Sequence, residues 1–64
     1  MAGQFEYDKG LIEELLSIDE GLRDSAIDFI EDLDKKRIRK GLALSTGQRQ
    51  RAEEILAEWE DRHG

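Results

Sequence analysis

Residues 35–51, KKRIRKGLALSTGQRQR, contain the signals that end one helix and begin the next. Gly41 follows the basic run, at the position where a residue in the left-handed conformation ends many helices. Residues 45–48, STGQ, match a capping box. In this motif the Ser45 side chain accepts a hydrogen bond from the Gln48 N–H, and the Gln48 side chain reaches back to the Ser45 N–H. The stretch therefore predicts two helices joined by a short turn.

Apolar residues recur at helical spacing on both sides of this stretch. Positions i, i+3, i+4 and i+7 lie on one face of a helix, and three groups of residues follow all or part of that spacing. The groups are Leu11, Ile12, Leu15 and Leu16; Ala26, Ile27, Phe29, Ile30 and Leu33; and Ala52, Ile55, Leu56 and Trp59. We therefore predict helices at about 9–17, 25–40 and 46–62.

Three short amphipathic helices can bury their apolar faces only by packing on one another. We expect an all-α fold, a small three-helix bundle in which the second and third helices form an antiparallel hairpin. Leu42 and Leu44, in the connector of that hairpin, are expected to close the bottom of the core. Residues 1–7 are expected to form an N-terminal tail and residues 8–64 a single helical domain, since 64 residues suffice for one domain at most.

The segment between the first two predicted helices, SIDEGLRDS at residues 17–25, interrupts the apolar pattern. Its Gly, Asp and Ser residues are typical of a turn. Asp side chains also accept hydrogen bonds from the first N–H groups of a helix, so Asp8 is predicted to cap the first helix. Asp19 or Asp24 is predicted to cap the second helix, with Asp24 preferred.

The composition excludes several kinds of site. The chain has no Cys and a single histidine, His63, so it has no disulfide, no thiolate nucleophile and no zinc site of the usual tetrahedral kind. A helical chain of this size rarely forms the cleft that a catalytic carboxylate pair needs, so we expect no enzyme. We expect no metal and no cofactor either.

The N-terminal residues MAGQFEYDKG have no basic start and no apolar run, unlike a signal peptide. No stretch of the chain approaches the roughly 20 apolar residues that are needed to cross a bilayer. The sequence therefore predicts a cytoplasmic protein that does not contact membranes.

The charges are separated along the chain. Residues 1–34 carry eleven acids and two bases, a net charge of −9, and residues 35–64 carry eight bases and five acids, a net charge of +3; together they give −6. Cations at the end of the second predicted helix suit the helix dipole, but Arg49 and Arg51 lie near the positive end of the third. Either the chain's own acids or a bound anion is expected to offset that cost.

A bound anion would find free N–H groups at the start of the third predicted helix, where Gly47 permits close approach. Two helices joined by a short turn are also similar to a helix-turn-helix, although the acidic net charge opposes non-specific binding to duplex DNA. The candidate nucleic-acid or anion site consists of Lys36, Arg37, Arg39, Lys40, Thr46, Gly47, Arg49 and Arg51.

Two further surfaces are candidates for binding a protein. The apolar face of the first helix exceeds what so small a core can cover, which favours a partner interface or self-association as a homodimer. Its residues are Leu11, Ile12, Leu15 and Leu16. The second helix has an acidic face, which is expected to be solvated or, alternatively, to imitate the charge of nucleic acid. Its residues are Asp24, Asp28, Glu31 and Asp32.

Residues 29–56, FIEDLDKKRIRKGLALSTGQRQRAEEIL, resemble a short helical module that recurs in phage and bacterial proteins near DNA replication and recombination functions. The module has an apolar helix, a Gly, Leu-Ser followed closely by Gln, and a second apolar helix. The matching residues are Phe29, Ile30, Leu33, Gly41, Leu44, Ser45, Gln48, Ala52 and Ile55. The module commonly has Lys just before the Gln, where this chain has Gly47, so a phosphate contact of that Lys does not carry over. The resemblance implies a setting in DNA metabolism and no defined activity.

These features together favour a non-catalytic, acidic helical adaptor or accessory protein that binds another protein, with phage DNA metabolism as its setting. A nucleic-acid-binding module that uses the basic hairpin at residues 35–51 is the first alternative. An acidic inhibitor of a DNA-binding enzyme is the second.

Overall fold

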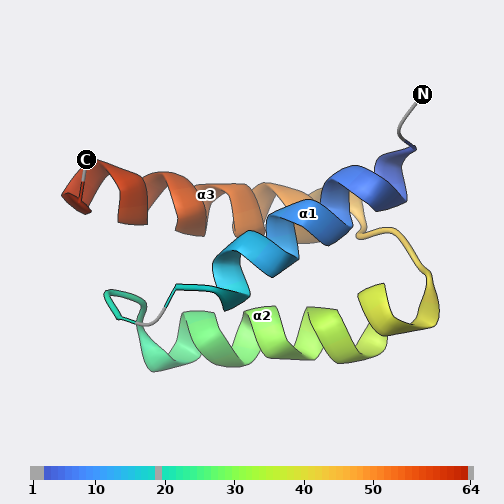
Figure 1. The fold of residues 1–64 in the computed structure, drawn as a ribbon, viewed down its shortest axis with the longest axis horizontal. Helices are drawn as coiled ribbons and strands as arrows, with labels where there is room; N and C mark the ends of the chain where they lie inside the picture. Colours follow the sequence, from blue (N-terminus) through green and yellow to red (C-terminus); the bar gives the residue numbers. More distant parts are fainter. Residues whose placement is uncertain (1–2, 19, 64) are drawn as a thin grey trace.

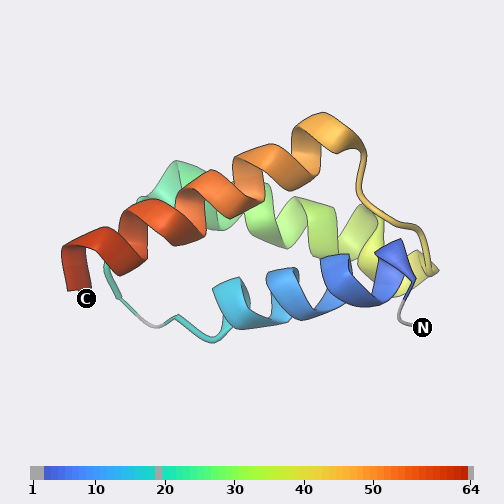
Figure 2. The same ribbon diagram turned by 90° about the horizontal axis from the view of Figure 1, so that it is seen from above.

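The computed structural model describes residues 3–18 and 20–63, which form three α-helices and one short 3-10 helix. The elements are α1 (Gln4–Leu16), α2 (Asp24–Lys36), η1 (Ile38–Lys40) and α3 (Thr46–His63). Successive helices run in opposite directions, so α2 and α3 form an antiparallel hairpin, and α1 lies across one face of it (Figures 1 and 2). The predicted all-α three-helix bundle is confirmed.

Helix α1 begins one to two turns earlier than its apolar pattern indicates. Residues 4–7, which we expected in the N-terminal tail, form the first turn of the helix. Phe5 is half-buried and packs against the core, so it extends the apolar face of α1 by one turn. Asp8 is therefore inside the helix, and its prediction as the N-cap is wrong: Gly3 occupies the cap position and makes no side-chain cap hydrogen bond.

Helix α2 differs from the prediction at both ends. Arg23 occupies its N-cap position without a side-chain cap hydrogen bond, and Asp24 is the first helical residue, so the predicted cap at Asp24 is wrong. Its carboxylate still lies in the first turn, where the helix dipole favours an acid. Asp19, the alternative cap, lies outside the described residues. The α-helix ends at Lys36 rather than near residue 40, and the tighter η1 turn that follows brings Ile38 into the core.

The core is formed by all elements of the bundle and by the connector before α3. Among the residues that the structure describes, nine apolar ones are buried: Leu11, Ile12, Leu15, Ile30, Leu33, Ile38, Leu44, Ala52 and Ile55. Leu44 closes the core as predicted, but Leu42 is 45 % exposed. The Leu42 N–H donates to the Arg37 carbonyl at 2.8 Å, which keeps Leu42 in the turn that ends η1, outside the core.

The connector of the hairpin has the predicted local structure. Gly41 is left-handed, with φ 77° and ψ 21°, and it ends η1. The capping box is formed from both sides: the Gln48 N–H lies 3.3 Å from Ser45 Oγ, and the Ser45 N–H lies 3.0 Å from Gln48 Oε1. Gln48 Oε1 also accepts a hydrogen bond from Arg37 Nε at 3.4 Å, which ties the end of α2 to the start of α3.

Two glycines are expected to respond to alanine in opposite directions. Gly10 lies inside α1, and a Cβ atom there would meet nothing within 4 Å, so Gly10→Ala should raise the free energy of unfolding by up to about 1 kcal/mol. Gly41 has equally open surroundings, but its positive φ disfavours any Cβ, so Gly41→Ala should lower that free energy by about 1 to 2 kcal/mol. Urea denaturation measures both changes. If both variants were more stable, or both less stable, than the unaltered protein, the left-handed conformation of Gly41 would be contradicted.

Candidate functional site

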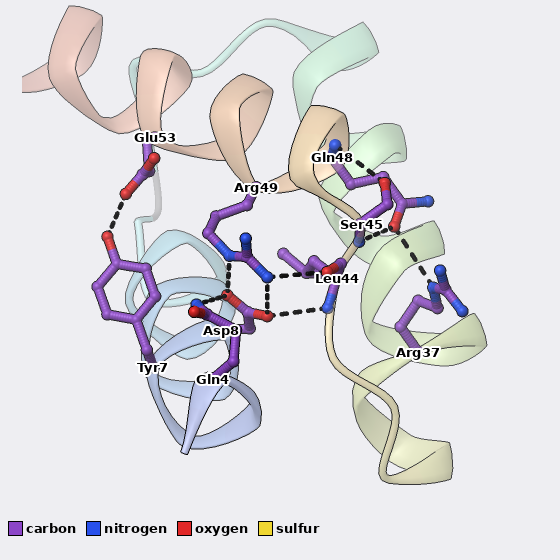
Figure 3. A network of polar contacts seen from close by, with 9 residues as sticks. All are labelled: Gln4, Tyr7, Asp8, Arg37, Leu44, Ser45, Gln48, Arg49 and Glu53. Atoms are coloured by element: carbon purple, nitrogen blue, oxygen red, sulfur yellow. Dashed lines mark hydrogen bonds and ion pairs between the residues drawn. The ribbon is translucent and has the colours of Figure 1, made fainter. Parts of the chain in front are cut away.

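Asp8 is the one buried charged residue in the described part of the chain, and Arg49 binds it. The Asp8 side chain is completely buried and the Arg49 side chain is 19 % exposed. Arg49 Nε lies 2.7 Å from Asp8 Oδ1 and Arg49 Nη2 lies 3.0 Å from Asp8 Oδ2, so the guanidinium makes two parallel hydrogen bonds to the carboxylate (Figure 3). Forty-one positions separate the two residues in sequence, and the pair joins α1 to α3.

Further hydrogen bonds around Asp8 bring the connector into the same network. The Leu44 N–H donates to Asp8 Oδ2 at 2.9 Å, and Gln4 Nε2 donates to Asp8 Oδ1 at 3.3 Å. Arg49 Nη2 also donates to the Leu44 carbonyl at 2.9 Å. Among the described residues, every buried side-chain nitrogen or oxygen has a hydrogen-bond partner. The Asp8 carboxylate therefore provides the hydrogen-bond acceptor for the backbone N–H of Leu44, in the connector just before α3.

The environment of Asp8 favours its charged form. Burial raises the pKa of the Asp8 carboxyl, but hydrogen bonds from Arg49, from the Leu44 N–H and from Gln4, with the positive charge of Arg49, lower it more. The net effect is a pKa of Asp8 below its usual range. The same hydrogen bond to Asp8 raises the pKa of the Arg49 guanidinium. Both groups are therefore charged at neutral pH, and their charges are satisfied within the chain.

A second contact between α1 and α3 lies nearer to the surface. The Tyr7 hydroxyl donates a hydrogen bond to the Glu53 carboxylate (Figure 3). This hydrogen bond to a carboxylate raises the pKa of Tyr7 above its ordinary value. The Tyr7 side chain is nevertheless about half exposed, so the contact supports the helix packing from outside the core.

The structure does not assemble the predicted anion site around Arg49. The cost of placing a cation near the positive end of α3 is offset by Asp8, one of the chain's own acids, and Arg49 is turned inward. Arg49 is therefore not available as a contact for nucleic acid. Sequence reasoning could not choose between the chain's own acids and a bound anion, since both have the same charge.

The other residues of the predicted anion site lie at the surface, and most contact their own chain. Arg39 pairs with Asp34 at 2.9 Å, and Arg51 approaches Glu54 at 3.6 Å. Lys36 pairs with Asp32 at 3.2 Å, while Arg37 donates to Gln48. Lys40, Thr46 and Gly47 are exposed. The Lys36–Asp32 and Arg51–Glu54 pairs are exposed on both sides, and ion pairs of this kind typically contribute about 0 to 1 kcal/mol to stability.

The predicted partner interface on the first helix is mostly inside the core. Leu11, Ile12 and Leu15 are buried, so the prediction that they are available to a partner is wrong. The helices of the hairpin cover these three residues, because α1 packs against both α2 and α3. Leu16 is the exception: it is 43 % exposed.

Leu16 borders an apolar groove between the end of α1 and the start of α2. The groove has a volume of about 210 Å³, and its apolar lining residues are Leu15, Leu16, Ile18, Leu22, Ile27 and Ile30. Ile27 is exposed at its edge, and among the described residues Glu31 is the one charged residue that lines it. Sequence reasoning missed the groove. Ile18 and Leu22, two apolar residues in an otherwise polar turn, were the signal that could have indicated it.

Within residues 3–18 and 20–63, no group of three or more His, Cys, Asp or Glu side chains is placed to hold a metal ion. Among the same residues, no helix has both the length and the apolar character that crossing a bilayer requires. The acidic face consists of exposed side chains on one side of α2.

Comparison with known proteins adds no relative. The chain matches no known protein family, no curated protein sequence and no solved structure.

Proposed function

We propose that this protein is a non-catalytic adaptor, and that the apolar groove between α1 and α2 binds a basic amphipathic helix of another protein. The observation that carries the proposal is the groove itself, with Leu16 and Ile27 exposed at its edges. Exposed apolar side chains that cluster beside a hollow mark interaction sites on soluble proteins. An amphipathic helix that lays its apolar face into such a groove is a recurring mode of recognition.

The charge around the groove supports a basic partner. The lining residues of the groove fall between positions 15 and 31 of the sequence. That stretch of sequence includes five acids and one base, and the whole segment 1–34 has a net charge of −9. Lys or Arg residues that flank the apolar face of a partner helix would be attracted to this surface and oriented on it. A second copy of the chain would bring two acidic surfaces together, so the same argument disfavours a homodimer through the groove.

The setting in phage or bacterial DNA metabolism remains part of the proposal, and it rests on the resemblance of residues 29–56. Proteins that bind nucleic acid carry basic surfaces or basic helices, which are the chemistry that the groove would recognise. An acidic protein that binds such a basic helix would also compete with nucleic acid for it. The proposed contact is therefore compatible with the inhibitor alternative as well. Direct binding of nucleic acid is less well supported, because Arg49, one of its predicted contacts, is paired with Asp8.

The proposal is tested with a synthetic helical peptide of Leu and Lys, in which the leucines follow the i, i+3, i+4, i+7 spacing. We expect the unaltered protein to bind it, as measured by calorimetry at physiological ionic strength. Leu16→Glu and Ile27→Glu should each weaken binding at least about tenfold, since they place a charge in the apolar contact. Leu42→Glu is the matched control, because Leu42 is equally exposed but lies in the connector, outside the groove.

The design separates apolar recognition from general attraction of charges. Each Glu variant makes the protein more acidic, so attraction alone would strengthen the binding of a Lys-rich peptide in all three variants. A scrambled peptide of the same composition, with its leucines distributed around the helix, should bind at least about tenfold more weakly. Equal binding of both peptides, or unchanged binding by Leu16→Glu and Ile27→Glu, would contradict the proposal.

A further inference from the structure

A second and smaller pocket lies between the start of α2 and residues 51–62 of α3. Its volume is about 70 Å³, and three of the six arginines of the chain line it: Arg23, Arg51 and Arg62. Trp59 forms part of its wall, and Glu58 is the one acid among the lining residues that the structure describes. The pocket shares only Leu22 with the apolar groove and is a separate site.

We infer that this pocket binds a phosphoryl dianion. Three guanidinium groups and one carboxylate give the lining a net charge of +2, and a phosphoryl group at neutral pH carries about −1.5 to −2. Guanidinium groups offer paired N–H donors that match the oxygens of phosphate. A chain with a net charge of −6 that nevertheless gathers three arginines at one hollow has a surface suited to an anion.

The helical spacing of α3 explains how part of this cluster arises. Arg51, Ile55, Trp59 and Arg62 follow one another at intervals of four, four and three residues, so they lie on one side of the helix. Arg23 reaches the same hollow from the N-cap position of α2. Twenty-eight positions separate Arg23 from Arg51, and the packing of the hairpin is what brings them together.

The arginines are available to a ligand. Within residues 3–18 and 20–63, neither Arg23 nor Arg62 forms an ion pair, and the Arg51 contact with Glu54 is long and exposed. A phosphoryl group can therefore recruit all three guanidiniums without breaking a buried contact. Arg49 differs, because its bonds to Asp8 hold part of the core together.

The backbone adds a secondary contribution from α2. Arg23 supplies no side-chain cap, and Ser25 lines the pocket in the first turn of the helix, where N–H groups have no intrahelical partner. The positive end of the helix dipole favours an anion there. The helix dipole and the arginines therefore both favour an anion in this pocket.

The size of the pocket limits the ligand to one charged group. A volume of about 70 Å³ is far below the roughly 300 to 1,000 Å³ of pockets that enclose a whole small molecule. The ligand is therefore either free phosphate or a phosphoryl group whose carrier stays in solvent. Inorganic phosphate and N-acetyl-O-phosphoserine amide distinguish these two sources.

The test uses Trp59, the single tryptophan of the chain and a wall of the pocket, as the reporter. Each ligand is titrated at neutral pH and constant ionic strength, while Trp59 emission and the backbone amide signal of Ser25 are followed. We expect saturable changes with at least one ligand. The double variant R51Q/R62Q should bind it at least about tenfold more weakly. Arg39→Gln is the control, since Arg39 lies outside the pocket and should leave the affinity unchanged.

The outcomes are distinct from those of the groove experiment. Circular dichroism of R51Q/R62Q verifies the helix content, so weaker binding is not confused with unfolding. The ligand with the higher affinity identifies the source of the phosphoryl group. A linear, non-saturable response to both ligands, or an equal affinity in R51Q/R62Q and the unaltered protein, would overturn the inference and leave the apolar groove unaffected.

Discussion

Asp8→Asn is expected to lower the free energy of unfolding by about 3 to 5 kcal/mol, the cost of breaking a buried ion pair by removing one partner. A chain of 64 residues has a total stability of about 3 to 10 kcal/mol, at roughly 0.05 to 0.15 kcal/mol per residue. The substitution should therefore remove a large part of the stability or unfold the protein. Urea denaturation followed by far-UV circular dichroism measures the change.

The expected loss follows from the geometry of the Asp8–Arg49 pair. Asn has nearly the shape of Asp and retains one oxygen that can accept a hydrogen bond from the Leu44 N–H. It has no negative charge, however, and its amide nitrogen cannot accept the second hydrogen bond from Arg49. The Arg49 guanidinium, which is mostly buried, would then lack the carboxylate that it is paired with. The cost of a buried unpaired charge, rather than lost volume, is what this variant measures.

The exposed pair of Asp32 and Lys36 provides the matched control. Its side chains are 52 % and 71 % exposed, and both belong to α2. Asp32→Asn removes the same charge from the same residue type and should change the free energy of unfolding by less than about 1 kcal/mol. Similar losses in the two variants would contradict the assignment of Asp8 as the polar centre of the bundle.

The pH dependence of stability provides a second readout of the same variant. The pKa of Asp8 is lowered in the folded protein, so its carboxylate stabilises the fold fully above the unfolded-state pKa of about 3.9. This contribution is lost as the pH falls through the folded-state pKa. The Asn side chain does not titrate, so Asp8→Asn should have a shallower acid limb than the unaltered protein. If the stability of the two proteins fell equally steeply at acid pH, the pKa of Asp8 would be the same in the folded and unfolded states, which would contradict this prediction.

Ile12→Ala is expected to cost about 2 to 5 kcal/mol of unfolding free energy. Ile12 is completely buried, and the alanine would leave a cavity where α1 meets the hairpin. The sequence pattern alone allowed Ile12 to be part of an exposed partner interface, in which case the same substitution would have almost no effect on stability. Thermal or urea denaturation of the isolated protein distinguishes a core location of Ile12 from a location in an exposed interface.

Leu16→Ala is the control for this second substitution. Leu16 belongs to the same apolar face of α1 but is 43 % exposed, so its truncation should cost less than about 1 kcal/mol. The two variants together define the border between the core and the groove. A cost for Leu16→Ala as large as that for Ile12→Ala would place Leu16 in the core and weaken the proposed docking surface.

The hairpin was the part of the fold that could be predicted most closely. Its signals are local: a glycine at the end of one helix, and the Ser45–Gln48 capping box at the start of the next. Each depends on the backbone of a few neighbouring residues, so the sequence contains all the information needed. The start of α1 was predicted less well, because Asp8 near the beginning of an apolar pattern has the same appearance as a cap.

The candidate sites were harder to predict because they depend on residues far apart in the chain. The buried contact of Asp8 with Arg49 and the shared pocket of Arg23 and Arg51 each connect separate elements. An arginine near the start of α3 has the same sequence signature whether it faces an acid of its own chain or an external anion. The distinction depends on which helix packs against it.

The sequence by itself determined three amphipathic helices, the turn that joins the last two and the separation of charge along the chain, because periodicity, caps and composition are local properties. Only the tertiary structure decided which apolar residues of α1 are covered, and that Arg49 is held by Asp8. The physical reason is that burial and ion pairing depend on distances between side chains. Those distances are set when the three helices pack together, and no single helix specifies them.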